Sequence, residues 1–165
     1  MRIYLAGFDV FREDTLAYGA SLKTMCQRYG FEGLYPLDNA IPAGLQGRAA
    51  AQWIYAGNLE LIRQADMVMA NLNNFRGHEP DSGTCFEIGF AKALNLPIWA
   101  YCADATALIE QIPHKRSPSG QCIDEQGYVV EDFGLTRNLM LSCSAEIVCG
   151  DVDDCLAQIA ASKRN

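Results

Sequence analysis

The sequence lacks the short motifs that mark the commonest nucleotide-binding and hydrolytic sites. It contains no G-x-G-x-x-G after a predicted strand and no G-x-x-x-x-G-K-[ST], which argues against a dinucleotide site and a P-loop. It contains no G-x-S-x-G, so a hydrolase with a serine nucleophile is not supported. No apolar run approaches about 18 residues, and we expect no transmembrane helix. The start, MRIYLAG, is soon followed by charged residues and is not expected to be a signal peptide.

Residues that bind metals at a recognisable spacing are also missing. The 7 cysteines are scattered with no C-x-x-C pair, and the 2 histidines, His78 and His114, do not stand at ligand spacings. An odd number of scattered cysteines favours a reduced, cytoplasmic protein without a metal or redox site. We expect His78, which lies in a loop with proline and glycine, to face solvent.

Basic charge is scarce as well. The chain has 13 Lys and Arg against 20 Asp and Glu, so its formal net charge is 13 − 20 = −7. This balance argues against a protein that binds the backbone of nucleic acids or an anionic membrane. Half of the 165 residues are hydrophobic, which predicts a globular chain with one core and a single domain, 1–165.

Short apolar segments alternate with longer amphipathic ones. The expected strands are 3–8, 31–35, 67–70, 97–102 and 147–148. The expected helices are 15–28, 48–65, 84–94 and 151–162, the last with Asp151 as its N-cap. We expect loops at 37–47, 71–83 and 103–127, the last of these mostly mobile, and a short helical turn within 135–141.

Strands that alternate with helices predict a parallel sheet covered by helices on both faces. Ligands of such sheets bind outside the carboxyl ends of the strands. The rule directs attention to residues that follow each strand, above all to the polar loop 71–83.

The segment 81–91, DSGTCFEIGFA, has a structural interpretation. Thr84 and Glu87 stand three residues apart at a predicted helix start, the spacing of a capping box. In that box the hydroxyl and the carboxylate satisfy amide donors that have no partner within the helix. On this interpretation Glu87 has no role in chemistry.

The same segment also has a catalytic interpretation. Glu87 has apolar neighbours, and Asp81 lies six residues upstream in a glycine-bearing loop at the carboxyl edge of the predicted sheet. Two carboxylates in one partly desolvated cleft can serve as nucleophile and proton donor in glycosidic chemistry. We expect the helix N-terminus to keep Glu87 ionised, as a carboxylate nucleophile must be.

Three further polar residues draw attention, and two of them have both a structural and a functional interpretation. Tyr4 lies in the first strand, where it is either a core residue or a group that orients Glu87. Asn58 lies in the middle of a helix, where it either faces water or turns inward to read a base edge. Asp66 precedes its strand and is expected to be structural, because it lies at the sheet edge opposite the expected site.

Taken in order, several blocks of the chain resemble the nucleoside 2-deoxyribosyltransferase family, and together they span nearly the whole sequence. The blocks are IYLAG at 3–7, GFEGLYPLDN at 30–39, the stretch from Ile54-Tyr55 to Asn58, NLNNFRG at 71–77, DSGTCFEIGFA at 81–91, VEDFG at 130–134 and NLM at 138–140. The resemblance implies a flavodoxin-like three-layer α/β sandwich with a five-stranded parallel sheet. It also implies a homo-oligomer that needs no cofactor.

The resemblance assigns the catalytic residues. Glu87 matches the family's nucleophile, which attacks C1′ of a 2′-deoxynucleoside and forms a deoxyribosyl ester that a second base then resolves. Tyr4 matches the tyrosine that orients this nucleophile, and Asp81 matches the carboxylate that contacts the base and passes a proton to it. Asn58 stands where other members have a base-binding aspartate, so its contact is left open.

The resemblance also implies that the substrate site is shared between subunits. Asn138 and Met140 match the segment that a neighbouring subunit inserts to bind the 5′-hydroxyl of the sugar. We expect Gly7 and Phe8 of the first loop, and Gly83 before the catalytic helix, to contact the substrate. The partners implied are 2′-deoxynucleosides and free nucleobases.

Two alternatives stay open at this point. One is a related hydrolase that cleaves the glycosidic bond of a 2′-deoxynucleoside 5′-monophosphate. The first loop, Gly7 to Phe11, is aromatic and acidic and suits a neutral 5′-hydroxyl better than a phosphate. The other is a non-catalytic nucleotide-binding domain in which Glu87 is only a cap.

Overall fold

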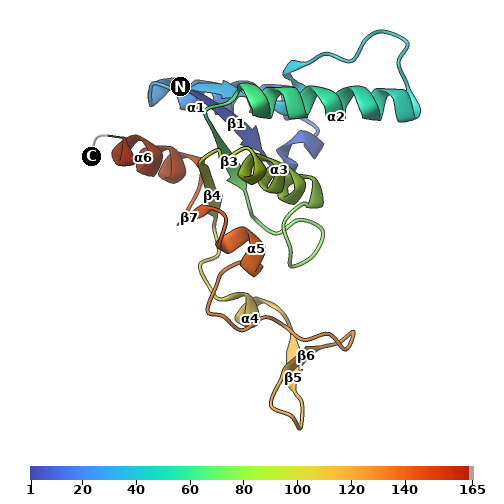
Figure 1. Cartoon of the computed structure of the whole chain (residues 1–165), viewed down its shortest axis with the longest axis vertical. Coiled ribbons are helices and arrows are strands. Elements are labelled where there is room, and N and C mark those ends of the chain that lie inside the picture. The colour runs from blue at the N-terminus through green and yellow to red at the C-terminus, as the bar shows by residue number, and fades with distance from the viewer. Residues whose placement is uncertain (164–165) are drawn as a thin grey trace.

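The computed structural model describes residues 1–163 and shows a three-layer α/β sandwich (Figure 1). Its central sheet has five parallel strands in the order β2-β1-β3-β4-β7. They are β1 (Arg2–Ala6), β2 (Glu32–Leu34), β3 (Met67–Asn71), β4 (Ile98–Cys102) and β7 (Glu146–Cys149). This order, in which the second strand lies outside the first, is that of flavodoxin-like sheets, and it confirms the expected fold class. The expected domain, 1–165, includes Arg164 and Asn165, which lie outside the described residues.

Four helices cover the two faces of the sheet. They are α1 (Thr15–Arg28), α2 (Gly47–Gln64), α3 (Ser82–Ala93) and α6 (Val152–Ser162). Successive residues of a strand point to opposite faces, so Tyr4 and Val68 pack under α2 and α3, whereas Ile3 and Met67 pack under α1 and α6. Every residue of β3 is buried, which accounts for its unbroken apolar sequence up to Asn71.

The first strand is shorter than predicted. It ends at Ala6, and Phe8 belongs to a 3₁₀-helix, η1 (Phe8–Phe11). Gly7 between them allows a close approach, since a Cβ there would stand 2.9 Å from both Asn71 Cβ and Asp9 Oδ2. A second 3₁₀-helix, η2 (Pro36–Asp38), follows β2 where the sequence predicts a loop.

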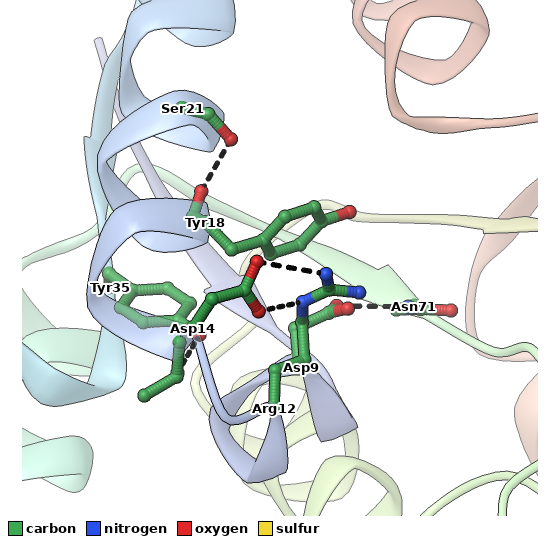
Figure 2. A network of polar contacts seen from close by, with 8 residues as sticks. Asp9, Arg12, Asp14, Tyr18, Ser21, Tyr35 and Asn71 are labelled. Atoms are coloured by element: carbon green, nitrogen blue, oxygen red, sulfur yellow. Dashed lines mark hydrogen bonds and ion pairs between the residues drawn. The ribbon is translucent and has the colours of Figure 1, made fainter.

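A chain of buried polar groups links the carboxyl ends of three strands. Asp9 and Asn71 are 6% and 5% exposed, and Asn71 Nδ2 donates to Asp9 Oδ2 at 2.9 Å (Figure 2). Asn71 Oδ1 in turn accepts from Asn73, and Asn73 Oδ1 accepts from the backbone of Ala103 after β4. The loops that follow β1, β3 and β4 are therefore tied together at the edge where ligands of such sheets bind.

The segment 103–127, which we expected to be mostly mobile loop, contains three short elements that the sequence did not predict. The segment contains α4 (Leu108–Gln111) and an antiparallel hairpin of β5 (His114–Arg116) and β6 (Cys122–Asp124), which projects from the sandwich (Figure 1). All three residues of β5 are exposed, so the sequence has no alternation of apolar and polar residues that would predict this strand. The chain then returns through α5 (Leu139–Ser142), beside the predicted helical turn.

A buried arginine holds the segment between β4 and α5 against the rest of the domain by hydrogen bonds. Arg137 is 1% exposed, and its Nε donates to the carbonyl of Leu72 at 2.7 Å. Its Nη1 donates to Thr136 O at 2.6 Å and to Gln111 Oε1 at 3.1 Å. Because carbonyl and amide oxygens accept these hydrogen bonds, Arg137 holds the base of this segment to Leu72, the residue after β3, and to α4.

Candidate active site

The side chain of Glu87 on α3 meets Tyr4 of β1. The Tyr4 hydroxyl donates to Glu87 Oε1 at 2.6 Å. The tyrosine is fully buried in the core between the sheet and the helices α2 and α3. Both interpretations of Tyr4 therefore hold, because its ring belongs to the core while its hydroxyl reaches Glu87.

Asn58 brings a third element to the same carboxylate. It lies on α2, its side chain turns inward, and Nδ2 donates to Glu87 Oε1 at 3.4 Å. Gly57 beside it lets the loop after η2 approach, since a Cβ there would stand 2.9 Å from Asn39 Nδ2. Both donors reach the same oxygen, and Glu87 Oε2 accepts no hydrogen bond from the described residues.

Burial changes the acidity of Glu87. Desolvation raises its pKa from 4.5 to about 7, and the negative charge of Asp81 acts in the same direction. The hydrogen bonds from Tyr4 and Asn58 lower the pKa but do not offset burial. At neutral pH Glu87 is therefore only partly ionised, and the helix N-terminus does not hold it fully ionised as expected. Glu87 lies in the second turn of α3, where the helix dipole has little effect.

The predicted capping box is also wrong. Helix α3 begins at Ser82, and its N-cap is Asp81, whose Oδ2 accepts from Thr84 N at 2.9 Å and from Thr84 Oγ1 at 3.1 Å. Thr84 is thus the residue that is capped, and Glu87 takes no part. The structural interpretation applies to Asp81, and Glu87 is left as a buried acid with no capping duty.

The remaining predicted substrate residues fall into two groups. Gly7 and Phe8 follow β1 at the carboxyl edge of the sheet, and Gly83 lies in the first turn of α3. Asn138 and Met140 are not brought to Glu87 within the chain. Asn138 caps α5 and donates to Glu131 Oε1 at 2.7 Å, and Met140 is 72% exposed.

A cleft of about 520 Å³ lies on another side of α3. It is largely apolar, with Cys85 and Ile88 on one wall and Asn138 and Met140 on the other, and Glu87 is not among its lining residues. This cleft and the Tyr4–Asn58–Glu87 cluster are separate features of the described chain.

Sequence reasoning missed the aromatic residue that stacks on the first loop. Phe75, in the loop after β3, stacks on Phe8 at 4.9 Å between ring centroids and on Phe11 at 5.4 Å. Arg76 lies over Phe75, 4.6 Å from its centroid. The run of asparagines before Phe75, directly after a buried strand, is the signal that pointed to this loop.

Other expectations concern residues outside the cluster. Asp66 is structural, since its Oδ2 accepts from Arg2 N at 2.6 Å, and His78 is exposed. Within residues 1–163, no three His, Cys, Asp or Glu side chains gather as a metal site would require. None of the helices described is both long and apolar enough to cross a bilayer.

Comparison with known families identifies the relationship. The family model for nucleoside 2-deoxyribosyltransferase matches residues 3–140. The chain belongs to this family. The matched range includes the Tyr4–Asn58–Glu87 cluster, Asp81 and the Asn138–Met140 segment.

The chain is similar to several individual proteins, of which the first below bears the family's activity in its name. A 2-deoxyribosyltransferase structure from Leishmania mexicana is 30% identical, covers 97% of both chains and superposes with a TM-score of 0.77. An uncharacterized protein of Schizosaccharomyces pombe is 25% identical over 155 residues, which are 84% of this chain and 74% of that protein. A CMP N-glycosidase of Clostridium botulinum is 14% identical, covers 98% of this chain and 99% of its own, and has a TM-score of 0.50. The last shares the fold alone.

Proposed function

We propose that the protein is a nucleoside 2-deoxyribosyltransferase that exchanges the base of a 2′-deoxynucleoside through a covalent deoxyribosyl ester on Glu87. The observation that carries the proposal is the partly buried Glu87 carboxylate, which has Oε1 fixed by Tyr4 at 2.6 Å and Oε2 without a hydrogen bond from the described residues. A fixed carboxylate with one free oxygen is suited to nucleophilic attack. Family membership supports the same reaction class.

The proposed chemistry has two displacements at one carbon. Glu87 Oε2 attacks C1′, and the electron pair of the glycosidic bond passes to the base nitrogen, which takes up a proton. A second base then attacks C1′ and loses its proton, and the ester bond breaks with its electrons returning to Glu87. Two inversions give net retention.

Asp81 is the proposed partner of the base. Its Oδ2 is occupied by Thr84, whereas Oδ1 accepts no hydrogen bond from a described residue. Oδ1 is thus the atom that would contact the base and carry its proton. Gly7, Phe8 and Gly83 would complete the substrate site from the first loop and the start of α3.

The apolar surroundings of Glu87 suit transfer rather than hydrolysis. The transition state carries positive charge on the sugar, and a buried carboxylate attracts that charge more strongly than a solvated one. Limited access of water protects the ester until a base arrives. The sugar lacks a 2′-hydroxyl, which would otherwise withdraw electrons and oppose the developing charge.

The site is proposed to be completed by a second subunit. Asn138 and Met140 make no contact with Glu87 in their own chain, and Met140 is largely exposed, as a residue that enters a neighbour's site would be in one isolated chain. Tyr55 on α2 and Phe86 on α3 are also about half exposed, with ring centroids 6.0 Å apart, which supports an apolar contact between subunits at these two residues.

The experiment that tests the function supplies deoxyinosine with adenine and, separately, deoxyadenosine monophosphate. We expect base exchange with the nucleoside, and a deoxyribosyl adduct on Glu87 detectable by mass spectrometry. The monophosphate arm is needed because Arg76 places a cation over the rings of Phe11, in the first loop, and Phe75. Cleavage confined to the monophosphate would overturn the transferase proposal in favour of a hydrolase.

The shared site has its own test. Asn138→Ala is expected to raise the KM for nucleosides. Mixed with Glu87→Ala, it should partly restore activity, because a hybrid oligomer then contains one site with both residues intact. Absence of restored activity in verified hybrids would contradict a shared site and leave the proposed chemistry standing.

A further inference from the structure

Asn58 has an unusual hydrogen-bonding state. Its Nδ2 donates to Glu87 Oε1 at 3.4 Å, whereas Oδ1 is buried and has no partner, the one buried side-chain oxygen or nitrogen in residues 1–163 of which this is true. Buried polar atoms are almost always paired, so an unpaired one calls for an explanation.

The orientation of the amide follows from the charge of Glu87. An ionised carboxylate only accepts hydrogen bonds, so Asn58 must turn its NH₂ group toward Glu87 and leave its oxygen unpaired. If Glu87 is protonated and its proton lies on the oxygen facing Asn58, rotation of the amide by a half-turn lets Oδ1 accept that proton's hydrogen bond. A carboxylate or an apolar side chain at position 58 offers no such choice between donor and acceptor.

We propose that Asn58 is a positioning residue, whose neutral amide holds the Glu87 carboxyl group in place in both of its protonation states. The proposal rests on the proposed function, in which Glu87 is free between turnovers and esterified within them. It differs from the interpretation in which Asn58 reads a base edge. Through Oε1, Asn58 and Tyr4 together keep Oε2 free for attack.

The groups that face Glu87 explain why neutrality matters. Tyr4 approaches it from β1, Asn58 from α2, and Asp81 acts on it from the start of α3. Asp81 already supplies one negative charge, which favours the protonated acid. An aspartate at position 58 would bring a second carboxylate within contact distance and oppose ionisation of the nucleophile more strongly.

The test compares Asn58→Leu and Asn58→Asp with the wild-type protein. The leucine has nearly the same shape without the amide, and Gln52→Leu, an exposed position on the same helix, is the matched control. The readouts are the titration of Glu87 followed by ¹³C NMR of glutamate-labelled protein, and the pH dependence of base exchange. Circular dichroism checks that each variant is folded.

Asn58→Leu removes a hydrogen bond from both states of Glu87, but the bond to the ionised carboxylate is the stronger of the two. We therefore expect Asn58→Leu to raise the pKa of Glu87 by at least about half a unit and Asn58→Asp to raise it further, with kcat falling more than KM rises. Activity of Asn58→Asp should recover partly at higher pH, while Gln52→Leu stays unchanged. An unmoved Glu87 titration in both variants, with only the KM for the base increased, would overturn the proposal and favour base reading. The NMR titration needs no turnover, so a protein without transferase activity would refute the proposed function and still test the role of Asn58.

Discussion

Asp9 on η1 is a buried carboxylate and Glu87 on α3 a partly buried one, and their surroundings differ. Asp9 accepts a hydrogen bond from Asn71, Asn71 accepts one from Asn73, and Asn73 accepts one from Ala103. These successive hydrogen bonds connect the loops that follow three strands. Glu87 receives two donors on one oxygen and none on the other, and the negative charge of Asp81 raises its pKa.

The difference separates structure from chemistry. A carboxylate embedded in a chain of hydrogen bonds stabilises the fold and has little freedom to react. A carboxylate held at one oxygen, in surroundings that oppose its charge, is costly to the fold and reactive toward a developing cation. The comparison predicts that substitutions near Glu87 change activity and that substitutions near Asp9 change stability.

The largest effect is expected from Glu87→Gln. The amide keeps the shape but has no nucleophilic carboxylate, so base exchange should fall by roughly 10³-fold or more. Exchange rates and adduct formation with deoxyinosine and adenine measure this, and Glu60→Gln, an exposed acid on α2, is the control. Activity within a few-fold of the wild type would remove Glu87 from the mechanism.

The same variant tests the cost of burying the charge. The pKa of Glu87 is raised from 4.5 to about 7, so folding favours its protonated form; that stability is present below pH 4.5 and lost as pH rises through about 7. Glutamine carries no charge at either pH. Glu87→Gln should therefore gain stability relative to wild type between pH 5 and pH 8, by on the order of 3 kcal/mol. Urea unfolding at the two pH values measures the change; an equal effect at both would contradict a raised pKa.

Tyr4→Phe should have the next largest effect. The ring stays in the core, and only the 2.6 Å hydrogen bond to Glu87 is lost. We expect kcat/KM to fall by roughly 10- to 100-fold, the worth of a hydrogen bond to a charged group. The pKa of Glu87 should rise further, because that bond lowers it, and the acid limb of the pH–rate profile should move to higher pH.

Tyr101→Phe is the matched control for Tyr4→Phe. Tyr101 is also buried in the sheet, on the face under α1 and α6. If the two variants gave the same pH–rate profile, Tyr4 would be a core residue and its contact with Glu87 would have no functional consequence.

Asn71→Ala tests the structural carboxylate. It leaves Asp9 buried without its amide partner, and we expect a loss of about 2–4 kcal/mol in the free energy of unfolding, measured by urea denaturation. Asp9→Ala combined with Asn71→Ala should cost less than the sum of the single changes, because no unpaired charge is left. A large loss of kcat with unchanged stability would place Asp9 in the chemistry instead.

Much of the fold follows from local patterns in the sequence. The buried run 67–71 and the spacing of apolar residues in 15–28 specify a strand and a helix whatever surrounds them, and the predictions there are close to the observed bounds. The hairpin at 114–124 has no such pattern. Its strands have three residues each, and those of β5 are polar and wholly exposed, so no apolar alternation in the sequence marks the pairing.

The candidate site also depends on contacts that local sequence patterns do not specify. The period of β1 places Tyr4 on one sheet face with Ala6, but no pattern says which helices cover that face. D-S-G-T offers two good N-caps, Asp81 and Thr84, and where the helix begins decides between them. The pKa of Glu87 depends on three elements that meet only in the folded chain, so its raised value could not be read from neighbours in sequence.

The smallest effect is expected from Asp14→Asn, which breaks an ion pair close to Asp9 (Figure 2). Arg12 Nε donates to Asp14 Oδ1 at 2.8 Å, but the two side chains are 44% and 56% exposed. Water and salt screen such a pair, and ordering two flexible side chains offsets its attraction. Arg12 also keeps its position over the Tyr18 ring, 4.3 Å from the centroid, without Asp14. We therefore expect the melting temperature of Asp14→Asn to equal that of the wild type at low and high salt. A melting temperature that falls in a salt-dependent way would mean that the exposed pair supports the buried Asp9–Asn71 contact. Burial alone would then not distinguish the charges that stabilise this protein from those that have no effect on its stability.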